Sequence, residues 1–303
     1  MAQERHILVV AHTGRPESLG AAVEACRQLT DAGTTPVLPG DQWDDLHHHA
    51  PELDGQTRRL GEGVEPEDLE FVVVLGGDGT ILRAAELVRA AAIPILGVNL
   101  GHIGFLAESE RDDLGEALRR ALARDYVVEE RMTLAVRVKN GTEVIHEDWA
   151  LNEATVEKAS RERMLEVAIE VDRRPLSTFG CDGVVLATST GSTAYSFSAG
   201  GPVVWPTLDA LLLVPLSAHA LFARPLVVGP DSALAVELLQ RTDASAILWC
   251  DGRRSFDLPP GARVVVRASK VPVRLARLHT GPFTDRLVGK FQLPVTGWRG
   301  PTP

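Results

Sequence analysis

The sequence predicts an α/β domain with a parallel sheet, followed by a mainly β, sandwich-like domain. Two observations indicate this division. Over the first 125 or so residues, apolar runs alternate with segments of helical spacing, which is typical of an α/β layer. From about residue 127, short segments alternate apolar and polar residues and are bounded by Gly, Pro and Asp. We therefore place the first domain at 1–126 and the second at 127–279.

The first domain contains three apolar runs that are typical of strands buried on both faces, namely Ile7–Ala11, Phe71–Leu75 and Ile95–Val98. Apolar residues recur at helical spacing over residues 19–29, 80–92 and 112–123. Strand, helix and strand in this order predict a parallel sheet that is covered by helices.

The second domain shows strand-like alternation instead. Met132, Leu134, Val136 and Val138 alternate with polar residues before the hairpin signal Asn140-Gly141. Leu165 to Val171 alternate in the same way, so we expect two packed sheets. In the tail, about 280–303, the spacing of Phe283, Leu287 and Phe291 predicts a helix, which we expect to pack back on the first domain.

Composition limits the function classes. The formal net charge of the 303 residues is −10, which argues against a nucleic-acid partner but leaves room for a local site that binds a small polyanion. Three scattered cysteines indicate neither a disulfide framework nor a zinc site, and adjacent histidines such as His47-His48-His49 cannot all face one ion. We therefore expect no protein-bound metal. No apolar stretch is long enough to span a bilayer, so we expect a cytoplasmic protein without a membrane partner.

The sharpest local motif is Gly76-Gly77-Asp78-Gly79-Thr80, at the point where a buried strand ends and a helix begins. Glycines there let backbone N–H groups approach a phosphate, and we expect Thr80 to cap the helix. We therefore predict a phosphate loop made of Gly76, Gly77, Gly79 and Thr80. A carboxylate beside phosphates suggests that Asp78 orients, or takes a proton from, an attacking hydroxyl; the alternative is a turn in which Asp78 bonds its own backbone.

Two further stretches carry polar chemistry. Residues 182–202, DGVVLATSTGSTAYSFSAGGP, concentrate hydroxyls and small side chains, and Tyr195 adds a ring suited to stacking on a base or ribose. Leu151-Asn152-Glu153 follows an alternating strand, and Asn152 and Glu153 can read an adenine edge and a ribose diol. A flexible linker and a polar strand end are the ordinary alternatives.

In this order and spacing, the three stretches resemble the NAD kinase family, and the resemblance covers most of the chain. GGDGT alone is shared with lipid kinases, and GGDG with phosphofructokinases, whereas DGVVLATSTGSTAYSFSAGGP is far more specific. ILGVNLGHIGFLAE at 95–108 supports the resemblance, and the tail FTDRLVGKFQLPVTGWRG is similar to that of actinobacterial members.

The resemblance implies a Rossmann-like first domain, a β-sandwich-like second domain and NAD bound between them. It implies phosphorylation of the adenosine-ribose 2′-hydroxyl of NAD to give NADP, with ATP or polyphosphate as donor and Mg²⁺ carried with that donor. It implies a homodimer or homotetramer in which part of the pocket reaches a neighbouring subunit. Asp78 is the implied catalytic base. The implied NAD-binding residues are Asp78, Gly79, Arg83, Asn152, Glu153, Arg163, Asp182, Thr193, Ala194, Tyr195, Ser196 and Ser198.

Three positions depart from the family pattern. Ser189 stands where Pro is usual and is expected to loosen its loop, Gly180 replaces a basic residue of some members, and Arg253 stands where Gln is frequent. Two alternatives remain at this point: a lipid kinase, which would need an apolar lining in place of the hydroxyl-rich 188–198 loop, and a dinucleotide sensor without turnover.

Overall fold

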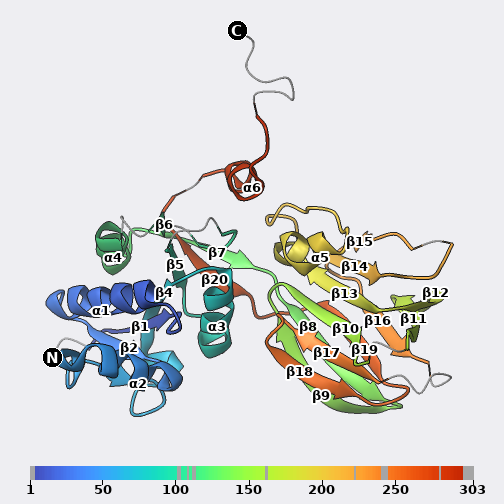
Figure 1. The fold of residues 1–303 in the computed structure, drawn as a ribbon, viewed down its shortest axis with the longest axis horizontal. Helices are drawn as coiled ribbons and strands as arrows, with labels where there is room; N and C mark the ends of the chain where they lie inside the picture. The colour runs from blue at the N-terminus through green and yellow to red at the C-terminus, as the bar shows by residue number, and fades with distance from the viewer. Residues whose placement is uncertain are drawn as a thin grey trace, which may run out of the picture. The chain divides into compact units, whose positions relative to one another are not determined.

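The protein divides into two compact units, formed by residues 1–130 with 273–303 and by residues 131–272. Figure 1 shows the chain coloured from its N-terminus to its C-terminus. The computed structural model describes residues 4–100, 104–107, 109–110, 114–160, 163–221, 223–239, 245–279 and 281–295. No helix in these ranges is long and apolar enough to cross a membrane.

The first unit is built on one eight-stranded sheet, in the order β3-β2-β1-β4-β5-β20-β7 with β6 beside β5. Its pairs β1·β2, β1·β4, β4·β5 and β5·β20 are parallel, which confirms the predicted parallel sheet. The strands are β1 (His6–Ala11), β2 (Thr35–Leu38), β3 (Arg58–Arg59), β4 (Leu69–Leu75), β5 (Ile95–Asn99), β6 (Ser109–Glu110), β7 (Val127–Arg131) and β20 (Val273–Arg277).

Helices pack on this sheet through apolar stripes. In α1, Pro16 sets the first turn, and Ala22, Cys26 and Leu29 are fully buried at helical spacing. The helices of the unit are α1 (Pro16–Asp31), α2 (Gly40–His49), α3 (Asp78–Val88), α4 (Leu114–Leu122) and α6 (Phe283–Phe291), with 3₁₀ turns η1 (Pro51–Leu53), η2 (Pro66–Asp68) and η3 (Arg89–Ala91).

One predicted helix boundary is wrong. The helix expected over 80–92 begins two residues earlier, at Asp78, and gives way to a 3₁₀ turn after Val88. Gly77 is the N-cap residue because its backbone is extended, and no side chain caps this helix. Thr80 is therefore the third helical residue rather than the cap, and its N–H donates to the Gly77 carbonyl at 2.9 Å.

The second unit contains two six-stranded sheets with antiparallel pairings, as predicted for a sandwich. One sheet has the order β15-β14-β13-β10-β17-β18, and the other has the order β12-β11-β16-β19-β8-β9. The strands are β8 (Leu134–Asn140), β9 (Glu143–Ala150), β10 (Glu153–Lys158), β11 (Leu165–Val171), β12 (Arg174–Cys181), β13 (Gly183–Thr188), β14 (Leu211–Leu216), β15 (Leu226–Val228), β16 (Leu234–Leu238), β17 (Ala246–Cys250), β18 (Arg254–Leu258) and β19 (Arg263–Ala268).

Alternating residues of both sheets form one core. Val136 on β8 and Val264 on β19 point into it from one sheet, and Val156 on β10 points into it from the other. The far face of β13 and β14 carries a smaller apolar cluster that Ala199 and Val204 cover. Both residues follow the short elements η5 (Thr190–Thr193) and α5 (Tyr195–Ser198), so the end of the hydroxyl-rich segment lies against this face.

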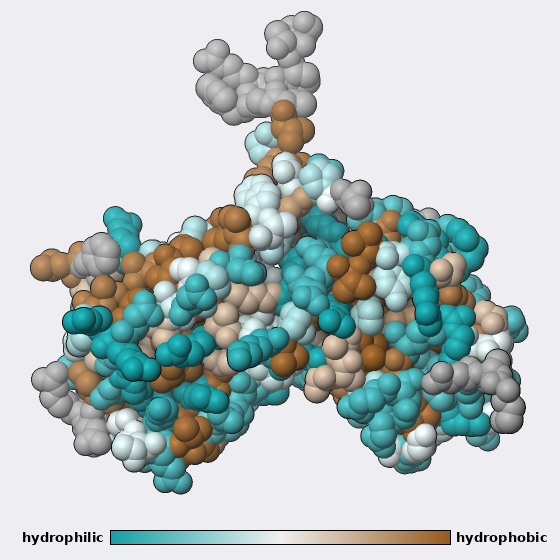
Figure 2. All heavy atoms as spheres, turned by 180° about the vertical axis from the view of Figure 1, so that it is seen from behind, coloured by the Kyte–Doolittle hydropathy of each residue, from teal (hydrophilic) through white to brown (hydrophobic). Residues whose placement is uncertain are grey.

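The division between the units differs from the boundaries we placed at 126 and 279. The first unit ends at 130, and the chain returns to it at 273 because β20 joins its sheet beside β5, where Leu275 pairs with Ile95. Val273 and Leu275 are buried in that sheet, so this apolar run belongs to the α/β unit rather than to the sandwich. On the face shown in Figure 2, hydrophilic residues predominate and hydrophobic ones form separate small patches.

Candidate active site

The turn between β4 and α3 is shaped by Gly76. A Cβ atom there would lie 2.5 Å from Thr80 Oγ1, so the close packing of Thr80 over the turn requires glycine. Gly77 and Gly79 are exposed, and a Cβ on either would meet no atom within 4 Å. The turn thus presents open backbone at the N-terminus of an 11-residue helix, which is a favourable place for an anion.

Asp78 is the first residue of α3, and its carboxylate is held by a separate loop. Oδ2 accepts the N–H of Phe105 and Oδ1 accepts the N–H of Leu106, each at 3.0 Å. A Cβ at Gly104 would lie 2.4 Å from Oδ1, so this loop approaches closely only as glycine. Asp78 is half-buried, and each oxygen keeps a lone pair for another partner. The carboxylate is therefore held in one orientation and can still accept further hydrogen bonds.

The loop that holds Asp78 is itself anchored by the C-terminal helix. The Phe105 ring lies 5.8 Å, centroid to centroid, from the rings of both Phe283 and Phe291 on α6. Arg286 on the same helix donates to the Phe105 carbonyl at 2.9 Å, and Arg277 donates to the Leu106 carbonyl at 2.8 Å. Sequence reasoning used residues 95–108 only for the resemblance and missed this supporting role.

Arg83 lies one turn into α3 and forms an ion pair with Asp41 of α2. Its side chain is about one-fifth exposed. The structure thus gives Arg83 a carboxylate partner within its own unit, beside the glycine turn.

In the second unit, a buried carboxylate shapes the corner between β9 and β10. Asp251 accepts the backbone N–H groups of Leu151, Asn152 and Glu153 at 2.9, 2.7 and 3.3 Å. Asp251 is 6% exposed, and burial raises its pKa while these three hydrogen bonds oppose the rise. The motif Asn152-Glu153 is therefore held from behind by a residue that sequence reasoning did not single out.

Glu153 is itself 8% exposed, and its Oε2 has no hydrogen-bond partner in the described part of the chain. Burial first, and then the nearby Asp251 carboxylate, raise the pKa of Glu153 to about 8, although the Tyr195 N–H donates to the carboxyl and opposes this shift. At neutral pH the group is therefore largely protonated. A protonated carboxyl can both donate to and accept from the hydroxyls of a ribose diol.

A cavity of about 340 Å³ opens beside this carboxyl. It is lined by Glu153, Thr155, Glu157, Tyr195, Trp249 and Gly252. Its volume is at the lower end of the range for small-molecule sites, and two aromatic side chains with two carboxyl groups suit a nucleoside fragment. The structure thus brings the predicted residues Glu153 and Tyr195 to one cavity, and it adds Thr155, Glu157 and Trp249, which the motif reading missed.

The hydroxyl-rich segment is tied to the same corner. A Cβ at Gly191 would lie 2.0 Å from the Asn152 carbonyl oxygen, so the two backbones can meet only through glycine. Thr188 Oγ1 donates to the Leu151 carbonyl at 2.6 Å and accepts the Gly191 N–H at 3.0 Å. This segment and the Asn152-Glu153 corner therefore form one framework.

Within that segment the predicted ligand residues have different surroundings. Tyr195 and Ser198 are exposed, and Thr193 and Ala194 are half-buried. Thr193 Oγ1 donates to the Thr190 carbonyl at 3.3 Å. Ser196 is fully buried beside Gly201, and its Oγ has no hydrogen-bond partner among the described residues. Its hydroxyl thus faces the interior rather than the surface.

Asp182 and Arg163 lie at the other end of the strands. Glu153 pairs with Ala187 at one end of the β10–β13 ladder, and Asp182 precedes Gly183 at the opposite end. Gly183 pairs with Glu157, and four residue steps of about 3.3 Å place this pair roughly 13 Å from the pair of Glu153 and Ala187. Asp182 forms an ion pair with Lys158, which lowers its pKa, and Arg163 is exposed just before β11. A single chain does not bring either residue to the Glu153 cavity.

Two of the departures from the family pattern have visible surroundings. The Ser189 hydroxyl donates to the Leu208 carbonyl, which ties the loop that we expected it to loosen. Gly180 lies beside Met164, whose Cε atom would be 2.9 Å from a Cβ at this position. Arg253 is exposed in the turn that follows β17.

The described residues include no group of three or more His, Cys, Asp or Glu side chains that could hold a metal ion.

Comparison with known proteins adds independent evidence. The family model described as the ATP-NAD kinase N-terminal domain matches residues 7–126, and the one described as the ATP-NAD kinase C-terminal domain matches residues 151–278. The chain is 70% identical to an NAD kinase of Leifsonia xyli subsp. xyli over 301 residues, covering 99% of both chains. It is 55% identical to NAD kinase 2 of Streptomyces coelicolor, covering 98% of this chain and 97% of that protein.

Solved structures agree with the fold. A structure of yeast NADH kinase complexed with NADH has a TM-score of 0.82 and 23% identity, and it covers 97% of this chain and 88% of the yeast chain. An NAD kinase from Archaeoglobus fulgidus in complex with ATP has a TM-score of 0.71 and 27% identity, covering 95% and 98% of the two chains. These matches confirm the resemblance drawn from the motifs and exclude the lipid-kinase alternative: the chain belongs to the NAD kinase family.

Proposed function

We propose that this protein transfers a phosphoryl group from a nucleoside triphosphate to the adenosine-ribose 2′-hydroxyl of NAD, giving NADP. The observation that carries the proposal is the Asp78 carboxylate, which two backbone N–H groups orient at the glycine-rich N-terminus of α3. This arrangement places a proton acceptor next to an anion-binding helix end, as in-line phosphoryl transfer to a hydroxyl requires.

Asp78 accepts a hydrogen bond from the attacking hydroxyl and takes its proton late in the reaction. A loose transition state needs little early deprotonation, so orientation of the hydroxyl matters more than a strong base. The Phe105 and Leu106 N–H groups keep the carboxylate in one rotamer while the substrate binds. The open backbone of Gly77 and Gly79 binds the donor phosphates, and Gly76 and Thr80 shape the turn.

The second unit supplies most of the NAD contacts in this proposal. The carboxyl of Glu153 holds a ribose diol, Asn152 reads the adenine edge, and Tyr195 stacks on a ring beside the 340 Å³ cavity. Gly79, Arg83, Thr193, Ala194 and Ser198 contribute further contacts. Ser196 supports the segment from inside, because its side chain is buried.

Asp182 and Arg163 act on a neighbouring copy in this proposal. They lie together at the end of the sandwich opposite Glu153, and a homodimer or homotetramer would let them complete another subunit's dinucleotide pocket. The protein works in the cytoplasm, and polyphosphate is a second possible donor for the same phosphate loop.

The Mg²⁺ ion enters with the donor. The described side chains form no cluster of three metal ligands, and Mg²⁺ keeps several waters and binds substrate phosphates readily. In this proposal, phosphate oxygens and water would hold the ion, and its charge would offset that of the phosphates.

A coupled assay for NADP formation from NAD, ATP and Mg²⁺ tests the proposal, with polyphosphate as a second donor. Wild-type protein should form NADP, and Asp78→Asn should form it several orders of magnitude more slowly. Asp44→Asn is the matched control, because it changes an exposed carboxylate of the same unit that has no assigned role. Absence of NADP with both donors would support a dinucleotide sensor instead.

A further inference from the structure

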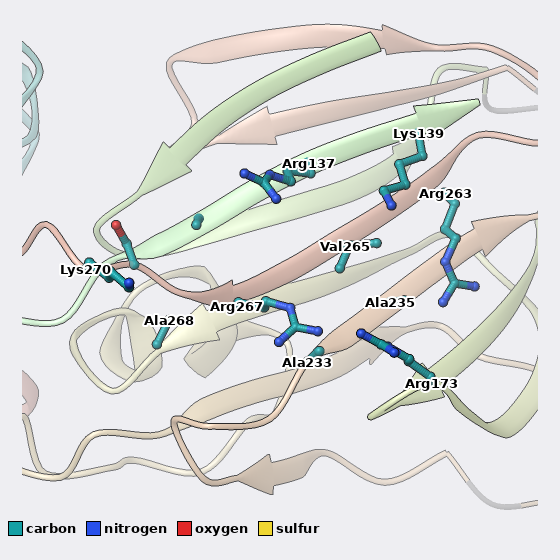
Figure 3. Close-up of a pocket in the computed structure, with 12 residues that line it drawn as sticks. Arg137, Lys139, Arg173, Ala233, Ala235, Arg263, Val265, Arg267, Ala268 and Lys270 are labelled. Atoms are coloured by element: carbon teal, nitrogen blue, oxygen red, sulfur yellow. The ribbon is translucent and has the colours of Figure 1, made fainter. Parts of the chain in front are cut away.

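A strongly basic cavity lies on the outer face of the sheet that contains β8, β19 and β16. Its volume is about 670 Å³, and it is lined by Ala135, Arg137, Lys139, Arg173, Ala233, Ala235, Arg263, Val265, Arg267, Ala268, Ser269 and Lys270 (Figure 3). Strand alternation explains the lining, since Val136 and Val264 point into the core and their neighbours point out. None of these residues belongs to the candidate active site.

Six of the lining residues are cations, although the chain as a whole carries a net charge of −10. Arg263 is neutralised by Glu170 and Glu237, and Arg137 pairs with Glu147. Within the described part of the chain, the remaining cations form no ion pair with a carboxylate; these are Lys139, Arg173, Arg267 and Lys270. The cavity therefore has an excess of positive charge that the fold does not balance.

The strand register brings like charges together. Lys139 on β8 is directly opposite Arg263 on β19, a cross-strand pairing that destabilises a sheet unless a counter-ion lies between the two charges. Arg267, four residues along β19, is roughly 13 Å away at about 3.3 Å per residue, and Lys270 lies beyond it. The positive charge thus extends along the strand, which fits an elongated anion better than a single phosphate.

The floor of the cavity is small and apolar. Ala135, Ala235 and Val265 are among its lining residues, and Figure 3 shows Ala235 and Val265 between the basic side chains. Small residues let an anion approach the sheet closely. The lining contains no aromatic side chain on which a base could stack, so recognition rests on charge and guanidinium hydrogen bonds alone.

Arg173 reaches the cavity from an unusual turn. Asp172 and Arg173 connect β11 to β12 with φ values of +51° and +65°, a conformation that usually selects glycine at the second position. The Asp172 carboxylate fixes the turn, because it accepts the Ala233 N–H at 2.8 Å and the Ser232 hydroxyl at 3.3 Å. Arg173 adopts this backbone conformation and places one more guanidinium at the cavity.

The cavity is separate from the Glu153 site within the second unit. Val156 of β10 and Val136 of β8 meet in the shared core, while Glu153 and Arg137 point to the outer faces of the two different sheets. Packed sheets lie about 10 Å apart, so the two cavities are on opposite sides of the sandwich.

We propose that this cavity is an ancillary binding site for a linear oligophosphate, either free or as the phosphate chain of a nucleotide. The proposal is independent of the phosphoryl transfer at Asp78, since it uses none of the residues assigned to that reaction. Arginine side chains bind phosphate oxygens in bidentate fashion, and the lysines add point charges at both ends of the site.

Isothermal titration calorimetry with inorganic tripolyphosphate tests this site. The variant Lys139→Ala/Arg267→Ala should take up one tripolyphosphate fewer per chain than the wild type, or bind it roughly tenfold more weakly at that site. Raising the salt concentration from 50 to 200 mM should weaken this site further, because the contacts are ionic. Inorganic phosphate should bind at least about tenfold more weakly than tripolyphosphate, and equal affinities would overturn the assignment to an extended anion.

The matched control is Arg224→Ala/Lys290→Ala, which removes the same charge from exposed positions outside the cavity. Its tripolyphosphate uptake should equal that of the wild type, and NADP formation should be unchanged in both double variants. Titration with ATP distinguishes a free oligophosphate from the phosphate chain of a nucleotide. If the cavity binds ATP as tightly as tripolyphosphate, its ligand is a nucleotide. If it binds ATP more weakly, its ligand is a free oligophosphate.

Equal uptake by the wild type and the cavity variant would overturn the proposal. So would an unchanged uptake accompanied by a lower oligomer mass in light scattering, because the cavity would then be a contact between copies of the chain. Neither result depends on whether NAD is phosphorylated, so the ancillary site and the proposed function fail or stand separately.

Discussion

The two units each contain a carboxylate held by backbone N–H groups of another segment, and the difference between the two is instructive. Asp78 accepts two such bonds and stays half-exposed, whereas Asp251 accepts three and is 6% exposed. The first is oriented and still free to meet a substrate. The second is saturated by the chain and holds the Asn152-Glu153 corner in place. The same hydrogen-bonding motif thus orients a carboxylate that we propose to be catalytic in one unit and holds a backbone corner in the other.

The largest expected effect separates these roles through activity. Asp78→Asn should lower kcat for NADP formation by about 10²–10⁴, because the amide cannot accept the hydroxyl proton. Its free energy of unfolding should change by only about 1 kcal/mol, since the side chain is half-buried and keeps one acceptor. The coupled assay and a urea titration measure the two quantities. A large loss of stability with normal turnover would reverse the roles assigned to the two carboxylates.

The second effect appears in stability. Asp251→Asn should destabilise the protein by about 2–3 kcal/mol, because an amide nitrogen would face buried N–H donors. Urea unfolding measures this change. Asp257→Asn, an exposed position on the neighbouring strand β18, is the control and should stay within about 0.5 kcal/mol of the wild type. Equal effects of the two substitutions would show that the Asp251 hydrogen bonds do not hold the corner.

The third effect is a pH dependence caused by Glu153. Its pKa rises from an ordinary 4.5 to about 8 on folding, so the folded state binds a proton that the unfolded state has lost between these pH values. Stability from this group is complete below pH 4.5 and falls as pH rises towards 8, by at most about 1.4 kcal/mol per pH unit. Urea unfolding at pH 5, 6.5 and 8 should show this decline.

Glu153→Gln removes the titrating group and should make the decline shallower over the same window. Glu143→Gln, at an exposed position on β9, is the control and should follow the wild type. A slope unchanged by Glu153→Gln would mean that other groups cause the pH dependence.

The smallest effect tests the support behind Asp78. Phe291→Ala removes one of the two α6 rings beside Phe105 and should lower kcat about two- to fivefold while KM for NAD changes little. Phe291→Leu should restore part of the loss by refilling the contact. A change in KM alone, with kcat constant, would show that α6 does not position the Asp78 loop.

The sequence predicted the strands and helices better than the contacts that hold them in place. The runs 7–11, 71–75 and 95–98 are strands β1, β4 and β5, because a continuous apolar run is a local signal of a buried strand. The helix start was misplaced by two residues, since Gly77 takes the extended N-cap conformation without a capping side chain. Propensity favours Thr80 as a cap, and the close packing against Gly76 decides otherwise.

Only those candidate site residues that stand in a local sequence motif were predictable. Asp78 and Glu153 stand in recognisable stretches, but their partners Leu106 and Asp251 lie 28 and 98 residues away along the chain. No local pattern specifies such pairings. Asp251 and Gly252 form the turn after β17, and only the fold shows that the Asp251 carboxylate enters the corner rather than the solvent.

The position of β20 has a consequence for the order in which the protein can fold. This strand lies inside the first sheet, between β5 and β7, yet it comes after the whole second unit in the chain. During synthesis, the edges of β5 and β7 that it joins must wait until the ribosome has passed residue 277. The sandwich can complete itself first, while the nascent α/β unit exposes strand edges that invite pairing with other chains. The α/β unit, although most of it is made first, is therefore the unit that is finished last.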